Sequence, residues 1–400
     1  MTSAGDLLQL VRSGAAGSRS DLARITGLSR TAVVSRLAAL EEIGLVRLGR
    51  DLASTGGRPA SGLVLDVDAG IVLAAAIGRS RSQVAVFDLA GTELTRESVE
   101  HEVGAPPGAV LPSVAEHLAR VAAERPGRPV LGTGVSLPGT VDPVRGVSID
   151  SPAMPGWDGV DLGAALVAAG IDPGTVLVAN DADVLARSER QGHAATHQDL
   201  VVVKASTGLG LGIIADSRVV AGHLGAAGEI GHTKVDAAAG RTCRCGDVGC
   251  LETIAAGWAL VAEMREAGRP VEHVRDLVAL AAGGDAEAKQ LLREAGRRLG
   301  EVLAVAVNVL NPEAVVVGGD MGAAFDVYTA GLRETVYARA ATIAVRDLRF
   351  LPSTFGDRAG LVGCASLVLD EVLSPEAVDA RLLAARRGEI DQTDGPINRR

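Results

Sequence analysis

The sequence predicts a two-lobed α/β protein with a small winged helix-turn-helix domain at its N-terminus. Its 400 residues suit two or three domains of roughly 100–150 residues each. Hydrophobic residues make up 47% and aromatic residues only 2%, so Ala, Val and Leu must build the core, which suits buried strands. From about residue 69, strand, turn and helix patterns alternate. We therefore expect a head over residues 1–67, a two-lobed body over 68–375 and a polar tail over 376–400, its last stretch disordered.

The charge distribution separates the head from the body. The whole chain has a net charge of −10, but residues 1–60 contain eight Arg and five acidic residues, which gives this segment +3 and the remainder −13. Arginine suits phosphates and guanine edges better than lysine does, and the segment contains no lysine. A small basic head on an acidic body is typical of a DNA-binding regulator.

Local signals in the head predict three short helices followed by two strands. Ser20 is a candidate N-cap for the second helix and Gly27 its stop, while Ser29 caps the third helix, which Gly44 ends. Two helices joined by a short turn that contains glycine form a helix-turn-helix. The remaining elements are a first helix over 6–11, strands over 45–48 and 63–67, and a glycine-rich loop over 49–61 that suits a wing.

The third helix carries the candidate DNA-binding residues. Apolar residues recur at helical spacing at Val33, Leu37 and Leu40. The opposite face then presents polar side chains to base edges and phosphates from the N-terminal half of the helix. These residues are Arg30, Thr31, Ser35 and Arg36. The alternative is a helical module for protein–protein contact or dimerisation.

The body reads as alternating strands and helices, which favours two lobes with a cleft between them. Strands are expected at 71–77, 83–89, 130–135, 175–179, 200–204, 211–215 and 314–317, and helices at 109–123, 257–267, 286–310 and 328–341. No apolar stretch reaches the ~18–20 residues that a membrane span needs. The N-terminus lacks the pattern of a secretory signal. We therefore expect a cytoplasmic protein that does not enter a membrane.

Three of the four cysteines lie close together in the sequence. Cys243, Cys245 and Cys250 are bent toward one another by glycines, and His232 precedes them. Three thiolates and an imidazole complete a closed tetrahedral site, so a bound zinc ion would be structural rather than catalytic. The alternative is a set of scattered buried thiols. Cys364 stands alone and is expected to be a small buried hydrophobe.

Several motifs together resemble the ROK family of sugar kinases and repressors, over about residues 5–370. The segment 228–232, Gly-Glu-Ile-Gly-His, is followed by Cys-x-Cys-Gly-x-x-Gly-Cys-Leu-Glu. The other matching stretches are Gly-Thr-Gly-Val-Ser-Leu-Pro-Gly-Thr-Val-Asp at 132–142, Asn-Asp-Ala at 180–182, Asn-Pro-Glu at 311–313 and Val-Gly-Gly at 317–319. The resemblance implies the actin/ribonuclease H-like sugar-kinase fold. A helix-turn-helix ending in Gly-Gly-Arg-Pro is similar to the repressor branch, which includes xylose and N-acetylglucosamine repressors.

The resemblance also implies a set of sugar-binding residues. They are Asn180, Asp181, Glu229, His232 and Glu252. Carboxylates and amides suit the adjacent hydroxyls of a sugar, and His232 would bind zinc with one ring nitrogen and a sugar hydroxyl with the other. In an active kinase of this family, Asp181 would be the general base. The alternative is that these polar residues are ordinary loop and cap residues.

One loop argues against kinase activity. Active kinases of the family carry Asp-x-Gly-Gly-Thr between the first two strands, where this chain has Ala76-Ile77-Gly78-Arg79-Ser80. A carboxylate is missing at Ala76, and the Arg79 side chain would obstruct close backbone approach to a phosphate. The glycine loop at 207–212 is retained, but a tight turn between strands also requires glycines. We therefore expect sugar binding without catalysis, so no residue is assigned as catalytic.

The expected partners follow from this interpretation. They are operator DNA, a small sugar or sugar phosphate, one structural zinc ion, and further copies of the chain in a homodimer or homotetramer, since two half-sites require at least a dimer. DNA and sugar would act on each other through different relative arrangements of head and body. An ATP-dependent sugar kinase is the first alternative. A regulator whose body binds a protein is the second.

Overall fold

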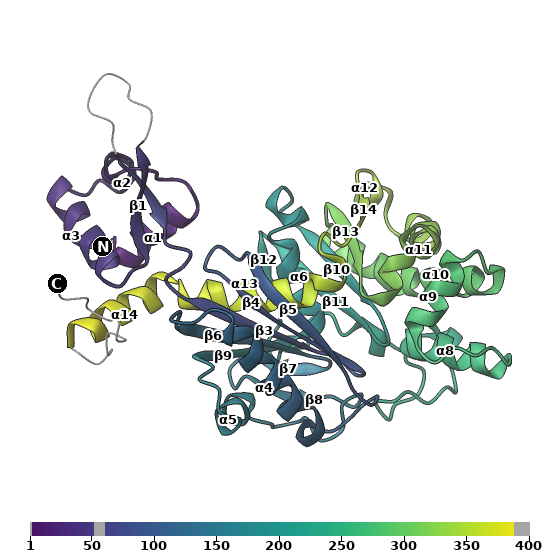
Figure 1. Ribbon diagram of the computed structural model, residues 1–400. Helices are drawn as coiled ribbons and strands as arrows, with labels where there is room; N and C mark the ends of the chain where they lie inside the picture. Colours follow the sequence, from purple (N-terminus) through teal and green to yellow (C-terminus); the bar gives the residue numbers. More distant parts are fainter. Residues whose placement is uncertain (1, 52–60, 388–400) are drawn as a thin grey trace.

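The computed structural model describes residues 2–51 and 61–387. It contains an N-terminal head, two lobes with one five-stranded sheet each, and a C-terminal helix that returns to the head (Figure 1). The predicted two-lobed α/β body with an N-terminal winged helix-turn-helix is confirmed. Most of the loop expected to be the wing, residues 52–60, lies outside the described residues.

The head packs its helices around a small leucine core. Leu7, Leu22, Leu37 and Leu40 are fully buried. Helix α2 begins two residues earlier than expected, because the Ser18 hydroxyl, not that of Ser20, accepts a hydrogen bond from the Asp21 amide (3.1 Å). The elements are α1 Ala4–Arg12, α2 Arg19–Thr26, α3 Arg30–Glu42, and the antiparallel strands β1 Val46–Asp51 and β2 Ser61–Leu65.

The first lobe is a mixed sheet in the order β5-β4-β3-β6-β9. Side chains alternate along its central strand: Ile71 and Leu73 pack with helices α4 and α5, while Val72 and Ala74 pack with α13. The elements are β3 Ile71–Ile77, β4 Arg81–Phe87, β5 Glu93–Glu100, α4 Pro107–Ala123, β6 Val130–Leu137, α5 Leu162–Ala168, β9 Thr175–Asn180 and α13 Ala359–Val372, with the hairpin β7 Thr140–Asp142 and β8 Val147–Asp150.

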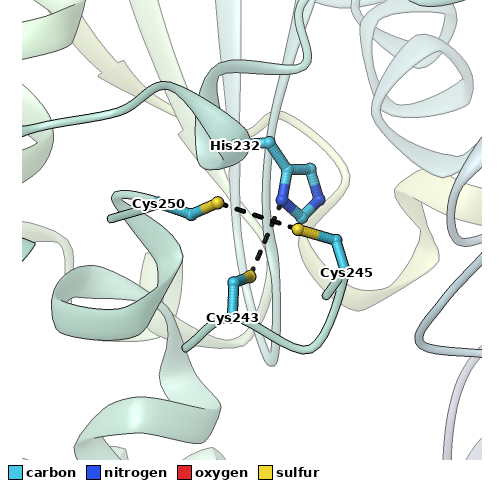
Figure 2. Close-up of side chains that lie close together, drawn as sticks. All are labelled: His232, Cys243, Cys245 and Cys250. Atoms are coloured by element: carbon cyan, nitrogen blue, oxygen red, sulfur yellow. Dashed lines mark hydrogen bonds between the residues drawn. The ribbon is translucent and has the colours of Figure 1, made fainter. Parts of the chain in front are cut away.

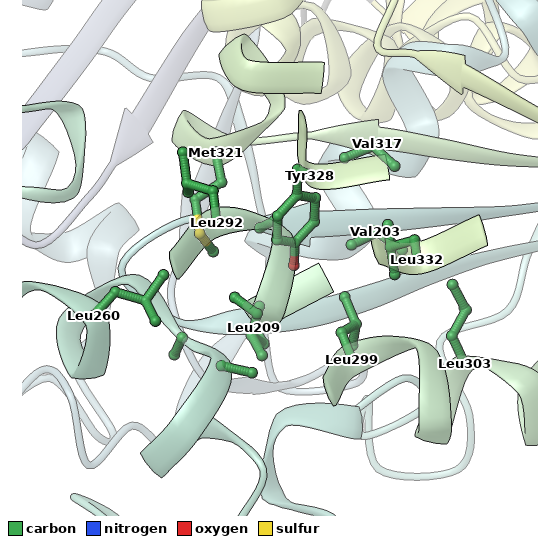
Figure 3. Close-up of a cluster of buried hydrophobic side chains, with 14 of the residues drawn as sticks. Val203, Leu209, Leu260, Leu292, Leu299, Leu303, Val317, Met321, Tyr328 and Leu332 are labelled. Atoms are coloured by element: carbon green, nitrogen blue, oxygen red, sulfur yellow. The ribbon is translucent and has the colours of Figure 1, made fainter. Parts of the chain in front are cut away.

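The second lobe is a sheet in the order β12-β11-β10-β13-β14. Val203 and Val317 pack with Tyr328 and with leucines of the helices on one face (Figure 3), and Val202 packs toward α6 on the other. The strands are β10 Leu200–Ala205, β11 Leu209–Ala215, β12 Arg218–Val219, β13 Ala314–Gly318 and β14 Arg349–Pro352. The helices are α6 Asp181–Glu189, α7 Glu252–Ala255, α8 Gly257–Glu266, α9 Val274–Ala282, α10 Ala286–Leu310, α11 Phe325–Arg339 and α12 Thr342–Val345. Short 3-10 turns lie at His193–Ala195, Ile230–His232, Asp236–Ala238, Asp320–Ala324 and Gly356–Arg358.

The segment expected to be a polar tail begins instead as helix α14, Pro375–Arg387. Val378 and Leu382, spaced four residues apart, are buried in the same hydrophobic cluster as the leucines of the head. Helix α1 approaches α14 so closely that a Cβ on Gly5 would collide with the backbone of Pro375, and the Gly5 amide donates to Asp379 Oδ1 at 3.0 Å. Apolar packing therefore outweighs the polar composition up to Arg387; residues 388–400 lie outside the described part of the chain.

None of the helices in residues 2–51 and 61–387 is long and apolar enough to cross a bilayer.

Candidate functional site

The exposed face of α3 is the candidate DNA-binding surface. Gly27 ends α2 in the left-handed conformation (φ 70°), and Ser29 caps α3 by accepting the Ala32 amide at 3.2 Å. Three of the four predicted residues, Arg30, Thr31 and Ser35, are exposed side by side on this face. Such a face can meet base edges and phosphates.

Two details of α3 differ from the expectation. Arg36 is only half-exposed, and its guanidinium donates to the carbonyls of Thr2 (3.0 Å) and Ala32 (3.3 Å), so it braces the N-terminal end of the head. Val34 was not predicted as a site residue, but it lies 47% exposed between Thr31 and Ser35. An apolar side chain at this place suits contact with a thymine methyl group. The signal in the sequence was its position outside the spacing of the buried residues.

The four predicted metal ligands converge in the second lobe (Figure 2). Cys243 Sγ lies 3.8 Å from His232 Nδ1, Cys245 Sγ lies 3.7 Å from Cys250 Sγ, and all four ligand atoms lie within 4.8 Å of one another. Tetrahedral ligands ~2.0–2.3 Å from a zinc ion are separated by roughly 3.3–3.8 Å. The cluster can therefore hold one tetrahedral metal ion.

The loop around the cysteines supports this arrangement. Gly246 and Gly249 have φ values of 93° and 86°, which L side chains rarely adopt, and they turn the chain back on itself. The Lys234 ammonium was not predicted to belong to the site. It donates to Cys250 Sγ at 2.9 Å and to Asp247 Oδ2 at 2.8 Å. A cation next to the thiolates offsets their negative charge.

A cleft of about 870 Å³ is lined by both lobes. This volume lies in the range of about 300–1,000 Å³ that is usual for small-molecule sites. All five predicted sugar-binding residues line the cleft: Asn180, Asp181, Glu229, His232 and Glu252. They come from β9, from the start of α6, from the loop that holds the metal cluster and from the start of α7. The fold thus brings together residues that are up to 72 positions apart in the chain.

Two of these five residues also anchor the backbone around the cleft. Asn180 is the N-cap of α6, where its Oδ1 accepts the Ala182 amide at 2.7 Å, and its Nδ2 donates to the Gly139 carbonyl at 2.7 Å. Glu252 accepts the Leu209 amide (2.7 Å) with one oxygen and the Trp258 indole N–H (3.2 Å) with the other. Each fixes a loop of the cleft before any ligand is bound.

The other carboxylates have different environments. Glu229 accepts the Thr140 hydroxyl at 3.3 Å, and burial raises the pKa of Glu229 above its usual value. Burial also raises the pKa of Asp183, in the first turn of α6, to about 7; Arg187 opposes this rise, and Asp181 and Glu229 add to it. Asp181 forms an ion pair with Lys204, with Nζ 2.7 Å from Oδ2. The charges of the cleft are thus partly compensated within the protein.

The loop at 76–80 borders the cleft as well. The Arg79 Nε donates to the Ala153 carbonyl at 3.0 Å, and burial lowers the pKa of Arg79. Across the cleft, the Arg244 guanidinium stacks over the Trp258 ring at 4.4 Å. Two arginine side chains, Arg79 and Arg244, thus line the cleft.

Comparison with known proteins decides the family. The model of the ROK family matches residues 72–371. The chain belongs to the ROK family. The DNA-binding transcriptional dual regulator NagC of Escherichia coli K12 is 28% identical over 379 residues, which cover 89% of each protein. A solved ROK family transcriptional regulator, a homologue of the E. coli MLC protein, is 26% identical with a TM-score of 0.77 and covers 95% of this chain and 98% of its own. A ROK family glucokinase from Streptomyces griseus, solved with glucose and AMPPNP, is 26% identical with a TM-score of 0.64 and covers 74% of this chain and 99% of its own.

Membership in the ROK family accounts for the body and for the predicted motifs, but Lys204 was missed. The chain contains only three lysines, at 204, 234 and 289, among 39 basic residues. Two of the three lie at the cleft or at the metal cluster. The rarity of lysine was a signal in the sequence, but the partner of Lys204 could not be identified without the fold.

Proposed function

We propose that this ROK family protein is a sugar-responsive transcriptional regulator of the repressor type. In this proposal the head binds operator DNA and the cleft binds a small sugar or sugar phosphate, which it does not phosphorylate. The observation that carries the proposal is the extent of the similarities. The regulators match 89% and 95% of the chain, head included, whereas the kinase matches 74%.

The exposed face of α3 supports the DNA-binding part. Arg30 is exposed and forms no ion pair with any residue in the described part of the chain. A free guanidinium at the N-terminal end of a recognition helix suits a phosphate or a guanine edge. Thr31 and Ser35 add hydroxyl groups, and Arg36 contributes mainly by bracing the head.

The cleft supports the sugar-binding part. Asp181, Glu229 and His232 provide acceptors and donors that match adjacent sugar hydroxyls. Asn180 and Glu252 each keep a loop in place, and each has capacity for at least one further hydrogen bond. Ala76 and Arg79, at the position of the phosphate loop in active kinases, argue against productive binding of ATP and Mg²⁺.

The remaining parts of the proposal concern cofactor, assembly and location. Zinc is the metal that best suits three thiolates and one imidazole in a closed site, and His232 then links the metal to the cleft wall. A homodimer or homotetramer would present two heads to two half-sites of an operator. A cytoplasmic location follows from the DNA partner.

Operator and effector can be identified with the full chain. DNA selected from a genomic fragment pool provides the operator, and a thermal-shift screen with glucose, xylose, N-acetylglucosamine and their phosphates identifies the effector. We expect one sugar to raise the unfolding temperature and to change operator affinity. A chain that selects no DNA sequence would contradict the regulator function.

The kinase alternative rests on the similarity of the body to the glucokinase and on the presence of Asp181. A coupled assay with ATP, Mg²⁺ and the same sugars distinguishes the two functions. We expect ADP formation at the background level, unchanged in Asp181→Asn. Turnover that disappears in Asp181→Asn would establish a kinase instead.

A further inference from the structure

A partly buried ion pair lies at the junction between the two lobes. Lys204 is at the carboxyl end of β10, between Gly210 of β11 and Gly318 of β13. Its side chain projects from the same sheet face as that of Val202, toward α6, because alternate residues of a strand share a face. The ammonium meets Asp181, the first residue of α6, at 2.7 Å, and the two side chains are only 21% and 20% exposed.

The surroundings of Lys204 are rich in carboxylates. Burial by itself would lower the pKa of Lys204, but the ion pair with Asp181, together with Asp320 and Glu252, raises it above its usual value. Asp320 is held by the Ser206 hydroxyl at 2.7 Å, and both oxygens of Glu252 are occupied by protein donors. In the described part of the chain, Lys204 is the only residue that forms an ion pair with Asp181.

The choice of lysine at this position is informative. The chain has three lysines among 39 basic residues, so arginine is its usual cation. An ammonium is a compact point charge with three donors, whereas a guanidinium is a flat, wider group. A lysine therefore places one compact positive charge among several carboxylates.

We propose that Lys204 is a positioning residue that acts as the permanent counter-cation of the cleft, holding the Asp181 side chain in place so that a sugar hydroxyl can bind it without a metal ion or nucleotide. Phosphoryl transfer depends on bound Mg²⁺ to neutralise charge. Here a cation that belongs to the chain supplies positive charge beside Asp181. The role in sugar binding rests on the proposed function; the role as counter-cation does not.

The first test needs no sugar. Lys204→Ala leaves space for a small cation, whereas Lys204→Met fills the space without a charge. Lys289→Ala, at an exposed position of α10, is the matched control. Thermal unfolding is measured with methylammonium, with Mg²⁺ and with neither. We expect wild type and Lys289→Ala to respond to neither ion, both Lys204 variants to unfold at lower temperature, and methylammonium to restore Lys204→Ala but not Lys204→Met.

The second test measures affinity for the sugar that the screen identifies. Wild type should bind equally well in buffer with Mg²⁺ and in buffer to which no Mg²⁺ is added. Lys204→Ala should bind about 10-fold or more weakly, in line with the loss of a charge-assisted hydrogen-bond arrangement, and methylammonium should recover part of the loss. Lys204→Arg should bind the sugar more weakly than Lys204→Ala does in the presence of methylammonium.

Two outcomes would overturn the proposal. One is an unfolding temperature of Lys204→Ala and Lys204→Met equal to that of wild type; the other is a wild type that binds sugar only with Mg²⁺. If the Lys204 variants fold only when methylammonium is present, that dependence supports the proposal. If the wild type binds no sugar, the proposed effector function fails, while the methylammonium test still decides the role of Lys204.

Discussion

The head and the cleft use charged side chains in opposite ways. On α3 the Arg30 side chain is exposed and makes no ion pair in the described part of the chain, whereas in the cleft Lys204 is paired with Asp181. Free positive charge suits a polyanion, whose counterions are released on binding. Compensated charge suits a neutral ligand with many hydroxyls, which needs directed hydrogen bonds rather than a net field. The difference indicates that the two regions are built for ligands of different chemistry.

Removal of the metal site should have the largest effect on stability, and the structural change should affect the cleft. Cys245→Ala deletes one of four ligands and should lower the free energy of unfolding by several kcal/mol, because binding of a structural zinc ion contributes directly to folding. Urea denaturation and elemental analysis measure the two effects. Cys364→Ala, a buried cysteine outside the cluster, should keep one zinc ion per chain. Purified protein without zinc, or a Cys245→Ala variant as stable as wild type, would contradict the metal site.

An intermediate effect is expected at the head. Arg30→Ala should weaken operator binding by about 10-fold, the usual scale for one good base or phosphate contact, and should alter salt dependence if the contact is to phosphate. Arg36→Ala should weaken operator binding less than Arg30→Ala does when the two variants are equally stable. The reason is that the Arg36 guanidinium already donates hydrogen bonds to the Thr2 and Ala32 carbonyls. Arg346→Ala, an exposed arginine of the body, is the control. Fluorescence anisotropy over a salt series gives the affinities; equal losses in all three variants would show that only net charge matters.

The head and the cleft could be predicted from the sequence by different kinds of signal. Caps, glycine stops and the spacing of Val33, Leu37 and Leu40 are local signals, so the head helices were expected close to their observed positions, and α10 was expected at its observed bounds. The residues of the cleft were identified because several short motifs matched one family. The ROK resemblance could not reveal contacts that this chain makes for itself.

The missed features depend on packing between distant segments. Lys204 and Asp181 are 23 residues apart and belong to different elements, so no periodicity joins them. Helix α14 has a polar composition, and only its packing on α1 shows why Val378 and Leu382 make it part of the core. Arg36 looked free because its partner, the Thr2 carbonyl, lies 34 positions away. In each case a tertiary contact overrides the local pattern.

The smallest effect on stability, but an informative one, is expected at Asp370, where head and body meet. Asp370 on α13 forms ion pairs with Arg187 (3.7 Å) and Arg190 near the end of α6, and with Arg12 (3.6 Å) of α1 in the head. Helix α6 begins with Asp181 in the cleft, so one rigid helix connects the cleft to a carboxylate that also holds the head. A shift of α6 on sugar binding would change the contact with Arg12.

Asp370→Asn should therefore reduce the fold-change in operator affinity that saturating sugar produces, while operator affinity without sugar changes little. The free energy of unfolding should fall by less than about 1 kcal/mol, because the Asp370 side chain is one-third exposed. Glu371→Gln is the matched control, since it removes the same charge from the next, exposed position of α13. Anisotropy titrations of operator with and without sugar give the ratio of the two affinities, and the logarithm of that ratio gives the coupling free energy. If Asp370→Asn retains the full sugar response, the communication between cleft and head does not pass through this carboxylate. A lost response in Glu371→Gln as well would assign the effect to net charge rather than to the ion pairs with Arg12, Arg187 and Arg190.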